Sequence, residues 1–236
     1  MKIRINKYLA SVGVASRRKI DDIISQSRIM VNDSLATPGI QVDPQVDKIF
    51  VDNKRILYTQ PKFAYYLLNK PAGVLSTCSD DRDRETVLNF VPNNQRLFPI
   101  GRLDCHTSGL IILTNDGDLS LKLTHPRYHL AKTYRLTIQG DIPRSTIQKL
   151  SEPIQLEDGH TLPAVVEKYV YSGPKTIIDL TIFQGKNRQI RRMCDALNLK
   201  LDSLNRISIG PVHMGTLKVG SYRSLTPDEV DALKQG

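Results

Sequence analysis

The chain has 236 residues, and 33 lysines and arginines against 24 aspartates and glutamates give it a formal net charge of +9 at pH 7. This length accommodates two domains of unequal size, and the basic balance favours a polyanionic partner, although it also suits a merely soluble protein. The three cysteines are far apart and odd in number, which excludes a disulfide framework and predicts reduced thiols. The first residues lack the apolar core of a signal peptide, and no apolar run reaches membrane-spanning length, so we expect a soluble cytoplasmic protein.

Two short helices are expected at the start of the chain. The first covers residues 4–12 and ends at Gly13. The second begins after Ser16, a good N-cap, and carries three cations in its first turn, Arg17, Arg18 and Lys19. Cations are disfavoured there by the helix macrodipole unless an anion binds, so this turn is a candidate phosphate site, with a solvated basic turn as the alternative.

Strand-like pieces follow at residues 29–31 and 48–51, and the polar stretch 52–62 is interpreted as a linker. Two small helices and a few strands predict a small α+β domain at residues 1–60. A larger domain, at residues 61–236, is expected to be mostly β with a few helices, because its apolar and β-branched runs are short and regularly interrupted by turns.

A loop at residues 101–109 carries two charged side chains, Arg102 and Asp104, and leads into the apolar run 110–113. That run is apolar enough to be a strand buried on both faces, so the loop is mounted at the edge of a core, where functional side chains tend to lie. The alternative is that Asp104 only accepts hydrogen bonds from nearby backbone N–H groups.

Further along, residues 132–138 alternate as a strand with Tyr134 on its apolar face, and an ordinary half-buried tyrosine is the simple interpretation of that position. A β-branched strand at 176–183 then leads into a basic segment. Asn187 is expected to cap a helix whose apolar face lies opposite Arg188, Arg191 and Arg192. The alternative is a solvated cationic face.

Three motifs together resemble the signature of the pseudouridine synthases that modify ribosomal RNA. They are GRLDxxTSGL at 101–110 with TNDG at 114–117, KTY at 132–134, and GKNRQIRRM at 185–193. The resemblance is narrower to the branch that carries a small N-terminal RNA-binding domain first seen in a small-subunit ribosomal protein. It implies an S4-like domain at 1–60 and, at 61–236, an α+β catalytic domain with a mixed, mainly antiparallel sheet and flanking helices.

The resemblance also implies roles for individual residues. Asp104 would be the catalytic carboxylate, Tyr134 would stack on the extruded uracil, and Arg188 would pair with Asp104. A carboxylate in a pocket that excludes water needs such a cation to remain ionised. Arg102 is our candidate for filling the gap left by the base. The cations expected to contact RNA are Arg102, Arg17, Arg18, Lys19, Lys70, Arg191 and Arg192.

Conversion of uridine to pseudouridine is an isomerisation, so no cofactor or metal is expected, in keeping with the lack of a phosphate-binding glycine loop or a metal-ligand cluster in the sequence. Asp104 could attack the sugar, attack the ring or remove a sugar proton, and these routes remain open. The expected partner is ribosomal RNA, with the large subunit as the leading target and the small subunit or a tRNA as alternatives, and the protein is expected to be a monomer. Two other classes remain: a non-catalytic RNA-binding protein and a base-excising glycosylase.

Overall fold

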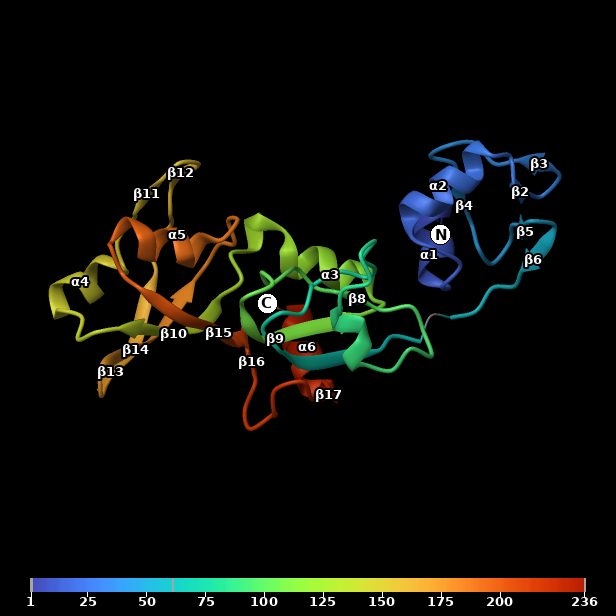
Figure 1. Ribbon diagram of the computed structural model, residues 1–236. Helices are drawn as coiled ribbons and strands as arrows, with labels where there is room; N and C mark the ends of the chain where they lie inside the picture. The colour runs from blue at the N-terminus through green and yellow to red at the C-terminus, as the bar shows by residue number, and fades with distance from the viewer. Residues whose placement is uncertain (1, 61, 236) are drawn as a thin grey trace. The chain divides into compact units, whose positions relative to one another are not determined.

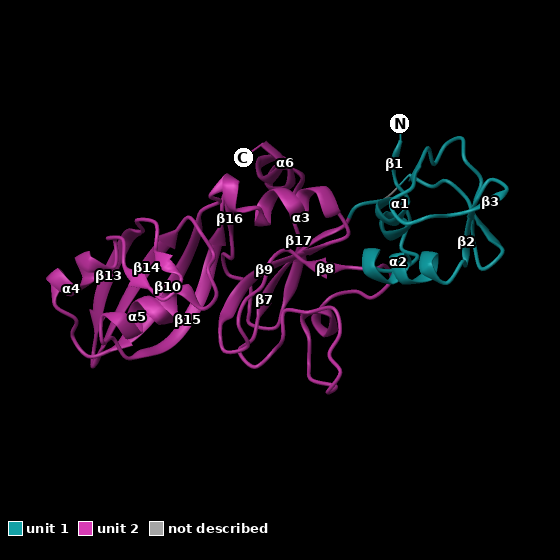
Figure 2. Ribbon diagram, turned by 90° about the horizontal axis from the view of Figure 1, so that it is seen from above, with its two compact units in different colours: residues 1–63 teal, residues 64–236 magenta. Residues whose placement is uncertain are grey.

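The computed structural model describes residues 2–60 and 62–235, and the contacts within the chain divide it into two compact units, Met1–Phe63 and Ala64–Gly236 (Figure 2). Met1, Pro61 and Gly236 lie outside the described residues, as does the point at which the expected boundary between residues 60 and 61 falls.

The first unit opens with β1 (Ile3–Arg4), α1 (Ile5–Ser11) and α2 (Arg17–Ser25), which confirms the two expected helices. Ser16 caps α2 as expected, because its hydroxyl accepts a hydrogen bond from a backbone N–H of the first turn at 3.2 Å. Gly13 follows α1 with a φ of +84°, a conformation that glycine adopts without a steric cost.

Four short strands form the antiparallel sheet of this unit in the order β3-β2-β5-β6: β2 (Ile29–Val31), β3 (Ser34–Leu35), β5 (Ile49–Val51) and β6 (Lys54–Ile56). A separate two-stranded sheet is formed by β1 and β4 (Gln41–Val42). Because β6 pairs with β5, the expected linker at 52–62 is wrong in its first half. One core joins the helices to the sheet, with Leu9, Ile20 and Ile29 completely buried in it.

The second unit is built on a nine-stranded sheet with the order β13-β14-β10-β15-β9-β7-β17, in which β8 also pairs with β9 and β16 with β15. All of its pairings are antiparallel except β9 with β15, which confirms the expected α+β class and the mainly antiparallel sheet. The strands are β7 (Tyr65–Lys70), β8 (Phe98–Pro99), β9 (Ser108–Thr114), β10 (Lys132–Gln139), β13 (Val165–Ser172), β14 (Lys175–Ile182), β15 (Leu201–Ile209), β16 (Val212–His213) and β17 (Tyr222–Ser224).

The parallel pairing of β9 with β15 is a seam between two halves of the sheet, which lie on either side of it in Figure 1. It consists of two residue pairs, Ser108 with Asn205 and Gly109 with Arg206. Gly109 has a φ of +106°, and a Cβ there would lie 2.3 Å from the backbone oxygen of Arg206. Only glycine fits this position, because any side chain would collide with the backbone of the opposite strand.

Helices cover both halves of the sheet. Two of them, α4 (Arg144–Lys149) and α5 (Gln189–Ala196), contribute to a core that also holds side chains of β10 and β14. The other two, α3 (Gly117–Thr124) and α6 (Pro227–Gln235), pack into a second core. A short hairpin, β11 (Gln155–Leu156) and β12 (Gly159–His160), stands apart from the main sheet, and a 3-10 turn, η1 (Val87–Phe90), lies between β7 and β8 in the chain.

The strand β9 is buried on both faces, as the apolar run 110–113 predicted. Ile111 and Leu113 belong to the core of α4 and α5, whereas Leu110 and Ile112 belong to the core of α3 and α6, and all four side chains are completely buried. The loop that precedes β9 is therefore anchored between two cores.

Candidate active site

Asp104 lies half-buried in the loop between β8 and β9. Its carbonyl oxygen accepts a hydrogen bond from the backbone N–H of Thr107 at 3.0 Å, which closes a tight turn. The neighbouring Leu103 is buried, and its backbone N–H and C=O both bond to the Ser76 hydroxyl, at 3.1 and 2.9 Å. The aspartate therefore sits on a loop fixed on both sides, with its carboxylate free of any ion pair among the described residues.

Lys70 supports this loop from inside the protein. Its side chain is completely buried, and Nζ donates to the carbonyl oxygens of Pro71, Val74 and Cys105 at 2.9, 2.8 and 3.3 Å. Burial lowers the pKa of this lysine to about 8, and the nearby Cys105 and Asp104 oppose the shift. Lys70 was expected to contact RNA, but its ammonium group is enclosed by protein, so it is placed to hold the loop instead.

A cavity of about 240 Å³ lies at the seam of the sheet, and it brings together residues from the three sequence motifs. Arg102 and Asp104 line it from the loop before β9, Tyr134 from β10, Arg188 from the N-cap of α5, and Arg191 from α5 itself. These residues are as many as 89 positions apart in the sequence, so only the fold assembles them.

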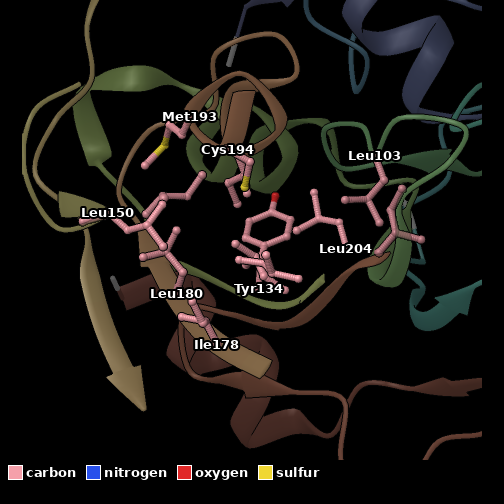
Figure 3. Close-up of a cluster of buried hydrophobic side chains, with 14 of the residues drawn as sticks. Leu103, Tyr134, Leu150, Ile178, Leu180, Met193, Cys194 and Leu204 are labelled. Atoms are coloured by element: carbon pink, nitrogen blue, oxygen red, sulfur yellow. The ribbon is translucent and has the colours of Figure 1, made fainter. Parts of the chain in front are cut away.

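Tyr134 is buried within the core beneath α5, where Figure 3 shows it among Leu180, Cys194 and Leu204. A register shift between Thr133 and Tyr134 interrupts the pairing of β10 with β15 at this point. Such irregularities commonly occur beside active sites, where they redirect a side chain. The tyrosine ring thus reaches the cavity from a rigid strand.

The ion pair expected between Asp104 and Arg188 is absent from the described residues. Arg188 has a φ of +47° and occupies the N-cap position, so the helix begins at Gln189 and Asn187 is not its cap. Arg188 therefore precedes the first helical turn, and its side chain is exposed. The residue that reaches the loop is Arg191, whose Nη2 donates to the carbonyl oxygen of His106 at 3.0 Å.

Arg192, expected to contact RNA, is occupied within the protein. Its guanidinium group forms two hydrogen bonds with the Asp158 carboxylate, at 2.9 and 3.1 Å, which lower the pKa of that carboxyl. Lys186 donates to three carbonyl oxygens of the same turn, at residues 158–160. These contacts hold the hairpin of β11 and β12 against α5 and the segment that precedes it.

The other expected RNA-binding cations are exposed. Arg17, Arg18 and Lys19 project from the first turn of α2, and Arg102 is exposed at the cavity. None of the four forms an ion pair with another described residue.

Sequence reasoning missed two cations in the cavity, Lys132 and Arg206. Burial, with a further contribution from Arg206, lowers the pKa of Lys132 to about 8. Arg206 lies in β15 and is only 3% exposed. A signal was present, because an arginine interrupts the apolar positions of the strand between Leu204 and Ile209.

Among the described residues, no group of three or more His, Cys, Asp or Glu side chains is arranged to hold a metal ion. No helix within residues 2–60 and 62–235 is both long and apolar enough to cross a membrane.

Comparisons with known proteins define the class to which this fold and cavity belong. A family model described as RNA pseudouridylate synthase matches residues 64–196, and one described as S4 domain matches residues 3–47. The chain belongs to the RNA pseudouridine synthase family, whose members are isomerases acting on RNA, and this confirms the resemblance drawn from the three motifs.

Individual relatives match over almost the full length of the chain. It is 40% identical to a Bacillus subtilis (strain 168) protein named ribosomal large subunit pseudouridine synthase B, over 98% of this chain and 95% of the relative. It is 37% identical to an uncharacterized RNA pseudouridine synthase of Aquifex aeolicus (strain VF5), over 99% and 94% of the two chains. A crystal structure of a pseudouridylate synthase matches with a TM-score of 0.67 and 31% identity, over 98% and 99% of the chains.

Proposed function

We propose that this enzyme converts one uridine of large-subunit ribosomal RNA to pseudouridine. The observation that carries the proposal is the single cavity that Asp104 and Tyr134 share, with arginines around it. The choice of the large subunit is supported by the name of the Bacillus subtilis relative, which matches nearly the whole of both chains.

In this reaction the bond between C1′ of the ribose and N1 of uracil breaks, and a bond between C1′ and C5 forms. C5 gives up its hydrogen to solvent and N1 gains a proton, so the atoms balance without a cofactor. Asp104 is the proposed carboxylate, acting as a nucleophile or as a base close to the glycosidic bond. Tyr134 is proposed to stack on the uracil after the nucleotide has left its helix.

In this proposal Arg191, and not Arg188, is the arginine that supports Asp104, the role that the family resemblance implied for Arg188. Its contacts with the loop of Asp104 support this assignment: Nη2 lies 3.0 Å from the carbonyl oxygen of His106 and 3.4 Å from the hydroxyl of Thr107. An arginine fixed against this loop brings positive charge to the segment that carries the carboxylate. Arg188 is left as an exposed cation at the cavity, available to an RNA phosphate.

The test is release of tritium from transcripts labelled at C5 of uridine, with the wild-type chain and the Asp104→Asn variant. We expect the wild type to release tritium from large-subunit transcripts without forming free uracil, and the variant to be slower by at least about a thousandfold. Free uracil would instead identify a glycosylase. RNA binding without either product would identify a non-catalytic binding protein. Tritium release from small-subunit or tRNA transcripts alone would show that the substrate is one of those RNAs and not large-subunit ribosomal RNA.

A further inference from the structure

Arg206 is a buried arginine whose hydrogen bonds are incomplete. Its Nε donates to the carbonyl oxygen of Leu110 at 2.8 Å, and its Nη1 donates to the hydroxyl of Tyr134 at 3.4 Å. The third nitrogen, Nη2, is buried and has no partner among the described residues. A buried donor without an acceptor is costly, and such groups are rare in folded proteins unless something absent from the free protein completes them.

The charge around Arg206 is also uncompensated. No described carboxylate forms an ion pair with it. The cavity that it lines contains six lysine or arginine side chains and a single carboxylate, Asp104. One of these cations is Lys132, and Arg206 disfavours its charged form. Because an unpaired guanidinium is expensive to bury, this arrangement favours a ligand that brings acceptors and negative charge into the cavity.

The position of Arg206 beside Tyr134 indicates that the acceptor is on the base of the ligand. The guanidinium carbon lies 5.9 Å from the centre of the tyrosine ring. A pyrimidine stacked on that ring would bring its edge to the guanidinium, and the edge of uracil carries two carbonyl oxygens, O2 and O4. Cytosine has an amino group in place of O4 and cannot accept a hydrogen bond there.

We propose that Arg206 is a catalytic residue that donates a hydrogen bond from Nη2 to a carbonyl oxygen of the extruded uracil. This inference rests on the proposed function. At O4 the contact distinguishes uracil from cytosine, and at either oxygen it also acts on the reaction itself. When the glycosidic bond breaks, its electron pair remains with the base, and the negative charge spreads over N1 and the carbonyl oxygens. Attack of Asp104 on the ring would place negative charge on the same oxygens.

A guanidinium at this oxygen therefore interacts more strongly with the charged intermediate than with neutral uridine, which is the condition for lowering the barrier. The contact is useful whichever of the three routes Asp104 follows. The two other hydrogen bonds of Arg206 hold it in place, because they tie it to β9 on one side of the seam and to Tyr134 on the other.

The test combines substitutions in the enzyme with substitutions in the base. Synthetic RNA hairpins carry uridine, 2-thiouridine or 4-thiouridine at the target, since sulfur accepts hydrogen bonds more weakly than oxygen does. Single-turnover rates are measured for the wild type, Arg206→Met and Arg206→Lys. Arg144→Met is the matched control, because Arg144 is exposed on α4 and does not line the cavity.

One of the two sulfur substitutions should slow the wild type and Arg144→Met by at least about tenfold, the size expected for a hydrogen bond to a charged group. The same substitution should slow Arg206→Met by less than about twofold, because the donor is already missing. RNA affinity should change by less than about twofold in all variants, since phosphate contacts dominate it.

Equal sensitivity of Arg206→Met and wild type to both sulfur substitutions would overturn the inference while leaving the proposed function intact. If Arg206→Met does not fold, Arg206→Lys decides. The single ammonium group of lysine cannot keep the bonds to Leu110 and Tyr134 and also place a donor where Nη2 lies, so unchanged rates and unchanged discrimination in that variant would also overturn the inference. Tyr134→Phe separates a direct contact from one acting through the tyrosine, because it should keep the sensitivity to sulfur. A wild-type enzyme that converts no uridine would defeat the proposed function, and this inference with it.

Discussion

Lys70 is a lysine with no exposed surface, and its ammonium group is surrounded by three carbonyl oxygens of the turn and loop beside Asp104. Such a group stabilises the loop through its hydrogen bonds and at the same time costs free energy because its charge is buried. The balance depends on pH, since removal of the proton relieves the burial cost.

The stability contributed by Lys70 should therefore increase at alkaline pH. Its pKa is about 8 in the folded protein and 10.5 in the unfolded chain, so between these values the unfolded state binds more protons. The free energy of unfolding of the wild type, relative to Lys70→Met, should rise by up to about 3 kcal/mol across this range. Denaturant unfolding of both proteins at several pH values measures it, and a difference that does not vary with pH would contradict the prediction.

Tyr134 should act mainly through its ring. Tyr134→Phe keeps the stacking surface and is expected to lose less than about tenfold in rate, whereas Tyr134→Leu should lose about ten- to a hundredfold, the size of a base-stacking contribution. Single-turnover tritium release measures both, and Tyr171→Leu serves as the control because Tyr171 is 53% exposed on β13. Equal rates for the Phe and Leu variants would exclude stacking.

The placement of Arg188 and Arg191 could not be predicted correctly from the sequence. All the candidates in the basic segment were visible, but a helix capped by Asn187 was needed to place Arg188 on the same helical face as Arg191. In the structure Arg188 itself is the N-cap, in a left-handed conformation, so the helix starts one position later and Arg188 lies outside its first turn. Such a conformation is uncommon for a residue other than glycine, and no residue pattern in this segment indicated it.

At the scale of elements, the seam between β9 and β15 is the feature on which the cavity depends. Each strand was expected from its apolar pattern, but their parallel pairing was not, because periodicity indicates which face of a strand is buried and says nothing about its neighbour. Gly109 is required at the seam because the backbone of Arg206 lies so close to it, and this contact is visible only in the structure.

Substitution of Gly109 by alanine should damage both stability and activity. The new Cβ would lie 2.3 Å from the oxygen of Arg206, in a backbone conformation that alanine avoids. We expect a loss of about 3 kcal/mol or more in the free energy of unfolding. Gly173→Ala is the matched control: φ is also positive there, but nothing lies within 4 Å of the added carbon, so about 1 kcal/mol is expected. Similar losses in the two variants would show that the close approach is unimportant.

At the scale of the whole molecule, the mainly antiparallel sheet and the two helices of the first unit followed from local patterns and from the family resemblance. The assembly of the cavity from three distant segments followed from the resemblance alone. The interrupted apolar pattern at Arg206 could have indicated a buried cation, but its unpartnered Nη2 is a property of the fold that no pattern of residue types records.

The basic first turn of α2 should contribute to RNA affinity without taking part in the chemistry. Replacing Arg17, Arg18 and Lys19 by glutamine should weaken binding and reduce the slope of log affinity against log salt by about 2 to 3, because up to three phosphate contacts are lost. The rate at saturating RNA should remain within about twofold of wild type. Glutamines at the exposed Lys54 and Arg55 of β6 form the control, and an equal change of slope there would indicate a general charge effect.

The pairing of residues 108–109 with residues 205–206 also bears on when the enzyme becomes competent. A nascent chain that has left the ribosome as far as α5 already contains the aspartate, the tyrosine and the motif arginines, yet it lacks the strand that joins the two halves. Contacts between segments so distant in the chain form late, after their intervening length has been ordered. We therefore expect copies of the chain that stop before β15 to be catalytically silent, and activity to arise only once that strand has been made.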